Sequence, residues 1–182
     1  TNVINGGAGN DSIDGRDGAD TLLGGSGDDT IIGGGGDDTI FYGTGNDSVE
    51  GGAGNDRIDD ASGFDSTADA STVSGGDGND TIFGSSAGDT LSGDAGNDSI
   101  GGESGNDLID GGAGADTILG GAGNDTILTS GGNDSIQGGN DADLIIATAT
   151  DPSGVYNFNV DGGAGGVDND TLDLSALIAD GW

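Results

Sequence analysis

Aspartate recurs at nine-residue intervals through most of this chain of 182 residues, two positions before an aliphatic residue. The chain has no histidine and no cysteine, so carboxylates and backbone carbonyls are its main candidate metal ligands. Hard cations, above all Ca²⁺, prefer such oxygen ligands. We therefore treat the aspartates at the recurring position as candidate metal ligands: Asp11, Asp20, Asp29, Asp38, Asp47, Asp56, Asp80, Asp89, Asp98, Asp107, Asp116, Asp125, Asp134, Asp143 and Asp170.

Each of these aspartates belongs to a nonapeptide repeat, G-G-x-G-x-D-x-U-x, in which U is aliphatic. Residues 24–32 (GGSGDDTII) and 120–128 (GGAGNDTIL) show the pattern. Two repeats are enlarged by six residues and the last one is widened, but each still has an aliphatic residue in the strand position, so the repeat pattern continues after it. The sequence predicts a single domain over residues 1–182. It consists of a first repeat block (6–59), an enlarged-turn module (60–74), a second repeat block (75–146), another enlarged-turn module (147–161) and a last repeat with an apolar cap (162–182).

The residue types within one repeat predict a strand and a tight turn. The x-U-x triplet has strand character, and the six residues before it must reverse the chain. We expect the glycines at positions one, two and four to allow positive φ and close backbone approach. Two triplets and two turns make one coil, and stacked coils would place the aspartates in two columns, one at each edge. Carboxylates about 5 Å apart in a column repel strongly unless a divalent cation lies between them.

The nonapeptide resembles the repeat of the RTX (repeats-in-toxin), hemolysin-type calcium-binding family, found in secreted bacterial toxins, proteases, lipases and adhesins. The resemblance implies an all-β fold: a right-handed parallel β-roll, which is a two-sheet β-solenoid with 18 residues per coil. It also implies Ca²⁺ ions between stacked glycine-rich turns, held by two aspartate carboxylates and by carbonyl groups of the loops. Six aspartate pairs in one column and about six in the other suggest on the order of a dozen Ca²⁺.

The composition alone is compatible with an acidic disordered tail, because the chain has 44 Gly and a net charge of -32. The regular placement of aspartates and aliphatic residues favours a fold instead. An EF-hand is excluded because its loop ends in a bidentate glutamate, and the only glutamates are Glu50 and Glu103. The strong acidity excludes nucleic acid and anionic membranes as partners, because both favour a basic surface. No stretch resembles a membrane span, so we expect no membrane insertion by this segment.

Several positions depart from the pattern. Enlarged turns at residues 60–71 and 147–158 should each interrupt one column; we interpret them as surface insertions, and an extra site using Asp65, Asp69 or Asp151 is the alternative. Ala87 and Asp141 each replace the fourth glycine, which puts cation binding at their turns in doubt. Aspartates outside position six, such as Asp28, Asp37 and Asp141, are expected to be solvated turn residues.

The leading functional hypothesis is a calcium-binding structural module that folds on Ca²⁺ binding outside the cell, as part of a larger secreted bacterial RTX protein. The alternative is an assembly or adhesion module of a surface layer, filament or adhesin, with self-association or neighbouring domains of the parent protein as partners. Ice binding is a remote third, suggested by an expected row of hydroxyl side chains that Arg57 interrupts. We expect no catalysis, because no nucleophile with a paired base is visible, and a secreted, extracellular or cell-surface location.

Overall fold

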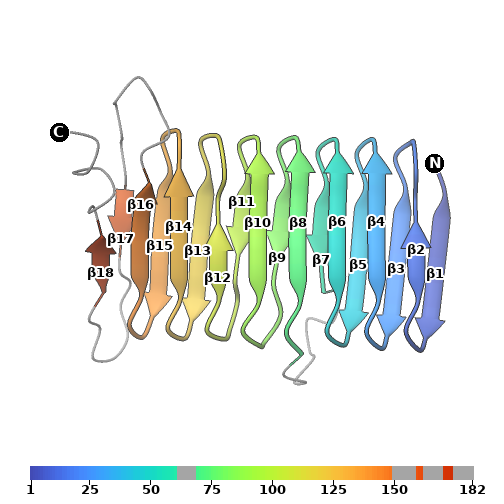
Figure 1. Cartoon of the computed structure of the whole chain (residues 1–182), viewed down its shortest axis with the longest axis horizontal. Helices are drawn as coiled ribbons and strands as arrows, with labels where there is room; N and C mark the ends of the chain where they lie inside the picture. Colours follow the sequence, from blue (N-terminus) through green and yellow to red (C-terminus); the bar gives the residue numbers. More distant parts are fainter. Residues whose placement is uncertain (61–68, 149–158, 162–169, 174–182) are drawn as a thin grey trace.

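The computed structural model describes residues 1–60, 69–148, 159–161 and 170–173. These residues form two parallel sheets of nine strands each, and none of them is helical (Figure 1). The first sheet contains, in spatial order, β1 (Val3–Ala8), β3 (Thr21–Ser26), β5 (Thr39–Thr44), β7 (Arg57–Asp59), β9 (Thr81–Phe83), β11 (Ser99–Gly101), β13 (Thr117–Ala122), β15 (Ser135–Asn140) and β17 (Asn159–Asp161).

The second sheet contains the even-numbered strands in the same order along the molecule: β2 (Ser12–Asp14), β4 (Thr30–Gly35), β6 (Ser48–Ala53), β8 (Thr72–Asp77), β10 (Thr90–Ala95), β12 (Leu108–Asp110), β14 (Thr126–Ser130), β16 (Leu144–Thr148) and β18 (Thr171–Asp173). The chain alternates between the two sheets, so each pair of strands makes one coil of a β-solenoid. The all-β, two-sheet solenoid predicted from the repeat is confirmed.

The strand register follows the repeat. Leu22 lies opposite Ile40, which is 18 residues later and therefore one coil further. Across the first enlarged module, Val49 lies opposite Val73, and across the second, Ile136 lies opposite Val160. The widened last repeat places Leu172 opposite Ile145. The extra residues therefore leave the register of the strands unchanged, because a shift of one residue would turn the aliphatic side chains out of the core.

Many strands are longer than the predicted triplet. Residues 21–26, for example, form one strand that continues through the first three positions of the next repeat. The start of each turn stays in register with the turn of the neighbouring coil, as the pairing of Gly25 with Gly43 shows. The backbone of the turn thus contributes to the ladder, which the x-U-x pattern alone did not predict.

One aliphatic side chain per repeat fills the space between the sheets. These residues are almost fully buried: Ile13, Leu22, Ile31, Ile40, Val49, Ile58, Val73, Ile82, Leu91, Ile100, Ile109, Ile118, Ile127, Ile136 and Ile145. Their neighbours in each strand alternate to the outside, as period-two geometry requires. Tyr42 joins this core although it stands where a repeat normally begins with glycine, and its hydroxyl donates a hydrogen bond to the carbonyl of Phe83 at 3.0 Å.

The glycines serve two different purposes in the turns. Those at the second and fourth positions adopt positive φ, as in Gly76 (φ 109°) and Gly96 (φ 151°). The first glycine does not, and is needed for close approach: a Cβ on Gly24 would lie 2.3 Å from the carbonyl oxygen of Tyr42 on the next coil and 2.6 Å from Oδ2 of Asp29. Stacked turns therefore contact each other backbone to backbone, at distances that leave no room for side chains.

Candidate metal centre

The structure aligns the candidate aspartates in two columns, one at each edge of the solenoid. In each column the backbone N–H of one aspartate donates to Oδ1 of the aspartate one coil further; Asp80 donates to Asp98 at 2.8 Å and Asp98 donates to Asp116 at 2.9 Å. The order along the edges is Asp20, Asp38, Asp56, Asp80, Asp98, Asp116, Asp134 in one column and Asp11, Asp29, Asp47, Ser71, Asp89, Asp107, Asp125, Asp143, Asp170 in the other.

The second carboxylate oxygen of most of these residues is buried without a hydrogen-bond donor. Each Oδ2 points back towards the first glycine of its own turn, as Asp38 does towards Gly33. A buried acceptor left without a partner costs about 1–3 kcal/mol, more when it is charged. The oxygens without a partner among the described residues are Oδ2 of Asp11, Asp20, Asp29, Asp38, Asp47, Asp56, Asp80, Asp98, Asp107, Asp116 and Asp125.

Backbone carbonyls supply further oxygen atoms beside the carboxylates. A Cβ placed on Gly76 would lie 2.0 Å from the carbonyl oxygen of Gly52, so the carbonyl at the second position points along the stack to the next turn. A Cβ placed on Gly33 would lie 2.4 Å from the carbonyl oxygen of Gly51 and 2.6 Å from Oδ2 of Asp38. No group of three or more acidic side chains able to hold a metal occurs in the described part of the chain. A cation here would combine carboxylates from the column with carbonyls, a donor set that suits Ca²⁺.

Comparison with known proteins supports this chemistry. The model of the RTX calcium-binding nonapeptide repeat matches the chain in seven overlapping stretches, residues 1–31, 14–49, 32–66, 65–100, 83–118, 92–127 and 119–149. The chain belongs to the RTX calcium-binding nonapeptide repeat family. No curated protein matches it. Because RTX nonapeptide repeats bind calcium, the chain is a calcium-binding repeat module built as a parallel β-solenoid.

The carboxyl groups of this RTX module lie in an environment that opposes their ionisation. Burial, and after it the neighbouring carboxylates of each column, raises the pKa of Asp107 and Asp116 to about 7. Burial also raises the pKa of Asp47, Asp56 and Asp80 to about 6. Each of these shifts is opposed by the hydrogen bond from the backbone N–H of the preceding coil. The columns therefore gain from any positive charge that binds between the coils.

Calcium-free protein is expected to gain β structure as the pH is lowered. The folded-state pKa values of about 6 to 7 exceed the unfolded-state value, so proton binding favours the folded chain. This stabilisation is complete below about pH 4 and is lost as the pH rises through the folded-state values. Far-UV circular dichroism of dialysed, calcium-free protein between these limits measures the effect. A calcium-free chain that is more ordered at pH 8 than at pH 5 would contradict it.

Ser71 occupies a rung that the sequence interpretation assigned to an interruption. The N–H of Asp47 donates to Oγ of Ser71 at 3.3 Å, and the N–H of Ser71 donates to Oδ1 of Asp89 at 2.7 Å. The enlarged turn therefore removes one carboxylate from the column but keeps its hydrogen bonds. The sequence carried the signal, because Ser71 stands two residues before Val73, the aliphatic residue of its module. The proposed extra-site residues Asp65 and Asp151 lie outside the described residues.

A second ladder of side chains runs beside the aspartates and was missed at the sequence level. At the fifth position, Oδ1 of Asn55 accepts from the N–H of Asn79 at 2.9 Å, and Oδ1 of Asn79 accepts from the N–H of Asn97 at 2.7 Å. In this ladder the N–H of the following coil donates to the side chain of the preceding coil, whereas in the aspartate columns the N–H of the preceding coil donates to the side chain of the following one. Asp28 and Asp37, expected to be solvated only, are exposed and also accept such bonds from Asn46 and Asn55. The recurrence of Asn before Asp was the available signal.

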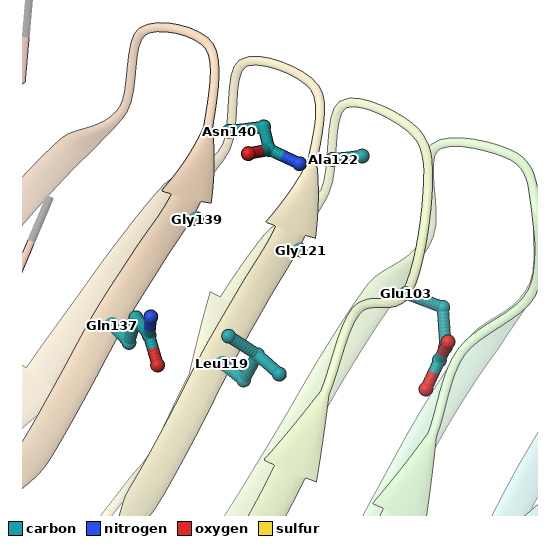
Figure 2. A pocket seen from close by; sticks show the side chains of 7 residues that line it. All are labelled: Glu103, Leu119, Gly121, Ala122, Gln137, Gly139 and Asn140. Atoms are coloured by element: carbon teal, nitrogen blue, oxygen red, sulfur yellow. The ribbon is translucent and has the colours of Figure 1, made fainter. Parts of the chain in front are cut away.

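An open pocket of about 440 Å³ lies on the outside of the first sheet, apart from the aspartate columns. Its polar side chains are those of Glu103, Gln137 and Asn140, and Figure 2 shows them apart from one another, with Leu119 between Gln137 and Glu103. None of the lining residues is a nucleophile paired with a base. No helix among the described residues is long and apolar enough to cross a membrane.

Proposed function

We propose that this chain is a calcium-dependent folding and rigidity module, in which the aspartates at the sixth position bind Ca²⁺ between adjacent coils. The observation that carries the proposal is the row of buried Oδ2 atoms without hydrogen-bond donors. Isolated buried charges of this kind persist in a folded protein only if they are paired or coordinate a metal. A bound cation would satisfy these oxygens and neutralise the repulsion along the column.

The residues of the chain would prepare each site in three ways. The N–H of the preceding coil fixes Oδ1, which orients the carboxylate so that Oδ2 faces the turn, as in Asp56 and Asp80. The glycines bring the backbone of two turns close enough to present their carbonyl oxygens to the same space. Burial excludes water from Oδ2, which strengthens the attraction for a cation. Calcium would supply the positive charge that the chain lacks.

The proposal extends to the biological setting of the module. A net charge of -32 disfavours the compact state when calcium is scarce. Sites with Kd values of about 10⁻⁴–10⁻³ M, typical of extracellular modules, would leave the chain unfolded in the cytosol and folded outside the cell. We propose that the chain serves a larger secreted bacterial RTX protein in this way, and that it has no catalytic role of its own.

The surface does not favour the two alternatives. An assembly module would need a long apolar face, but the exposed Ile32, Leu108 and Leu119 stand singly between polar or small residues of the adjacent strands. The hydroxyl row expected for ice binding does line up on the first sheet, at Thr21, Thr39, Thr81, Ser99, Thr117 and Ser135, yet Arg57 interrupts it with a side chain that is 47% exposed.

Measuring bound calcium in two matched variants tests the proposed function. Asp98→Asn keeps an oxygen for the N–H of Asp80 but removes the negative charge, so it should lose at least one Ca²⁺ per chain. Asp28→Asn makes the same change at an exposed position outside the columns and should retain the full count. Equilibrium dialysis against millimolar calcium, with elemental analysis of the solutions on both sides of the membrane, gives the ratio. Equal calcium content in both variants would rule out the aspartate columns as the binding sites.

A further inference from the structure

We propose that Asp89 and Asp134 hold no calcium, because hydroxyl groups of the chain occupy the coordination that a cation would take. The inference rests on the proposed function, since it assigns which of the fifteen candidate aspartates take part. It goes beyond the family pattern, in which both residues fill the same position as the other aspartates. Three observations lead to it.

The first observation is the environment of Asp89. Its Oδ1 accepts the N–H of Ser71, as in the rest of the column. Its Oδ2, however, accepts the N–H of Ser85 at 2.6 Å and lies 3.0 Å from Oγ of the same serine. Oγ of Ser85 in turn accepts the N–H of Ala87 at 3.2 Å and lies 3.0 Å from the carbonyl oxygen of Asp69, so it is held in place. Asp89 therefore has both oxygens satisfied by the protein.

The second observation is a similar arrangement at the other edge. Thr129 stands at the first position of its repeat, where most repeats have glycine, and is buried. Its hydroxyl donates a hydrogen bond to Oδ2 of Asp134. The preceding aspartate of this column, Asp116, has the usual Oδ2 without a donor. A threonine side chain thus fills the space beside the carboxylate that glycine leaves open in the other turns.

The third observation concerns the backbone of the same two turns. In the regular repeats the second residue adopts positive φ even when it is not glycine, as in Arg16 (φ 71°), Asp94 (φ 68°) and Glu103 (φ 71°). The two exceptions are Ser85 and Ser130, which are the second residues of the turns that end at Asp89 and Asp134. These two turns therefore differ from the others in the backbone conformation of the second residue as well as in the hydrogen bonds to Oδ2.

Each carboxylate oxygen has two lone pairs, so the exclusion is steric: the hydroxyl of Ser85 or Thr129 lies against Oδ2 in the space beside the turn that a cation would need. On the edge that carries Asp89, the calcium column would then divide into one block around Asp29 and Asp47 and another beyond Asp107, separated by rungs without metal at Ser71 and Asp89. On the second edge the calcium column would end at Asp116. The middle and the far end of the roll would be held by hydrogen bonds alone at these rungs.

Restoring the consensus glycine tests this assignment. Ser85→Gly removes the hydroxyl and permits positive φ at the second position, and Thr129→Gly removes the hydroxyl at the first position, so each variant is expected to bind about one more Ca²⁺ per chain than the unmodified protein. Ser104→Gly, the same change at an exposed third position, is the control and should leave the count unchanged. Calcium counts that stay at the unmodified level in both test variants would overturn the inference, whereas an unmodified protein without bound calcium would overturn the proposed function instead.

A second measurement does not require that a variant bind more calcium than the unmodified protein. Asp134→Asn keeps a side chain that can hydrogen-bond to Thr129 and should leave the calcium count unchanged, while Asp98→Asn should lower it by at least one. A loss of calcium in Asp134→Asn, matching that in Asp98→Asn, would show that Asp134 is a ligand and refute the assignment.

Discussion

Excess chelator is expected to convert the folded roll into an unfolded chain, with loss of the entire β-sheet signal in far-UV circular dichroism. The columns contain buried carboxylates at successive rungs, with few positive charges in the chain to offset them; Arg16 and Arg57 are its only basic side chains. The aliphatic core is one side chain wide, so packing cannot compensate for this repulsion. Binding and folding should therefore be a single event, as in other small metal-dependent domains.

A requirement for calcium, which other salts do not meet, distinguishes metal coordination from simple screening of charge. Adding back calcium should restore the signal, whereas sodium chloride of the same ionic strength should leave the chain unfolded, because exposed charges are screened more effectively than buried ones. Amide hydrogen exchange should show protection appearing in the strands of both sheets together. A roll that keeps its β signal and its protected amides in excess chelator would show that the columns are stable without metal.

Gly96→Ala is expected to lower the free energy of unfolding in saturating calcium by roughly 3 kcal/mol or more, through backbone strain and overpacking together. Gly96 has φ 151°, and a Cβ at this residue would lie 1.5 Å from the carbonyl oxygen of Gly78 on the preceding coil. Because the contacting atom is backbone, the stack itself must shift to accommodate the methyl group. Urea unfolding at a fixed, excess calcium concentration measures the change.

Gly35→Ala is the matched control for this prediction. Gly35 lies in a turn of the same edge but its φ is not positive, and a Cβ there would meet only Oδ1 of Asp17, at 3.7 Å. The residue in register on the next coil is already alanine, Ala53. The variant should unfold within about 0.5 kcal/mol of the unmodified protein, as is usual for surface substitutions. Equal losses in the two variants would mean that turn stacking does not set the need for glycine.

The sequence was sufficient to predict the two-sheet solenoid and the alignment of the aspartate columns. The reason is that each coil repeats the one before it, so a residue's neighbours are given by a fixed step of 18 positions along the chain. Even the enlarged modules could be placed, because Val73, Val160 and Leu172 remain in the aliphatic position and the register follows them. The apolar cap predicted near residue 174 lies outside the described residues and stays a prediction.

The tertiary structure decided how individual turns depart from this rule. Ser71 continues a column because the neighbouring coil presents an N–H to it, and Tyr42 enters the core because its hydroxyl reaches the carbonyl of Phe83. The hydroxyls of Ser85 and Thr129 matter because they meet Oδ2 of Asp89 and Asp134. A repeat pattern specifies which residue types stack, since that depends on spacing alone. Whether a buried carboxylate oxygen is left free depends on the three-dimensional positions of donors, which a single repeat does not determine.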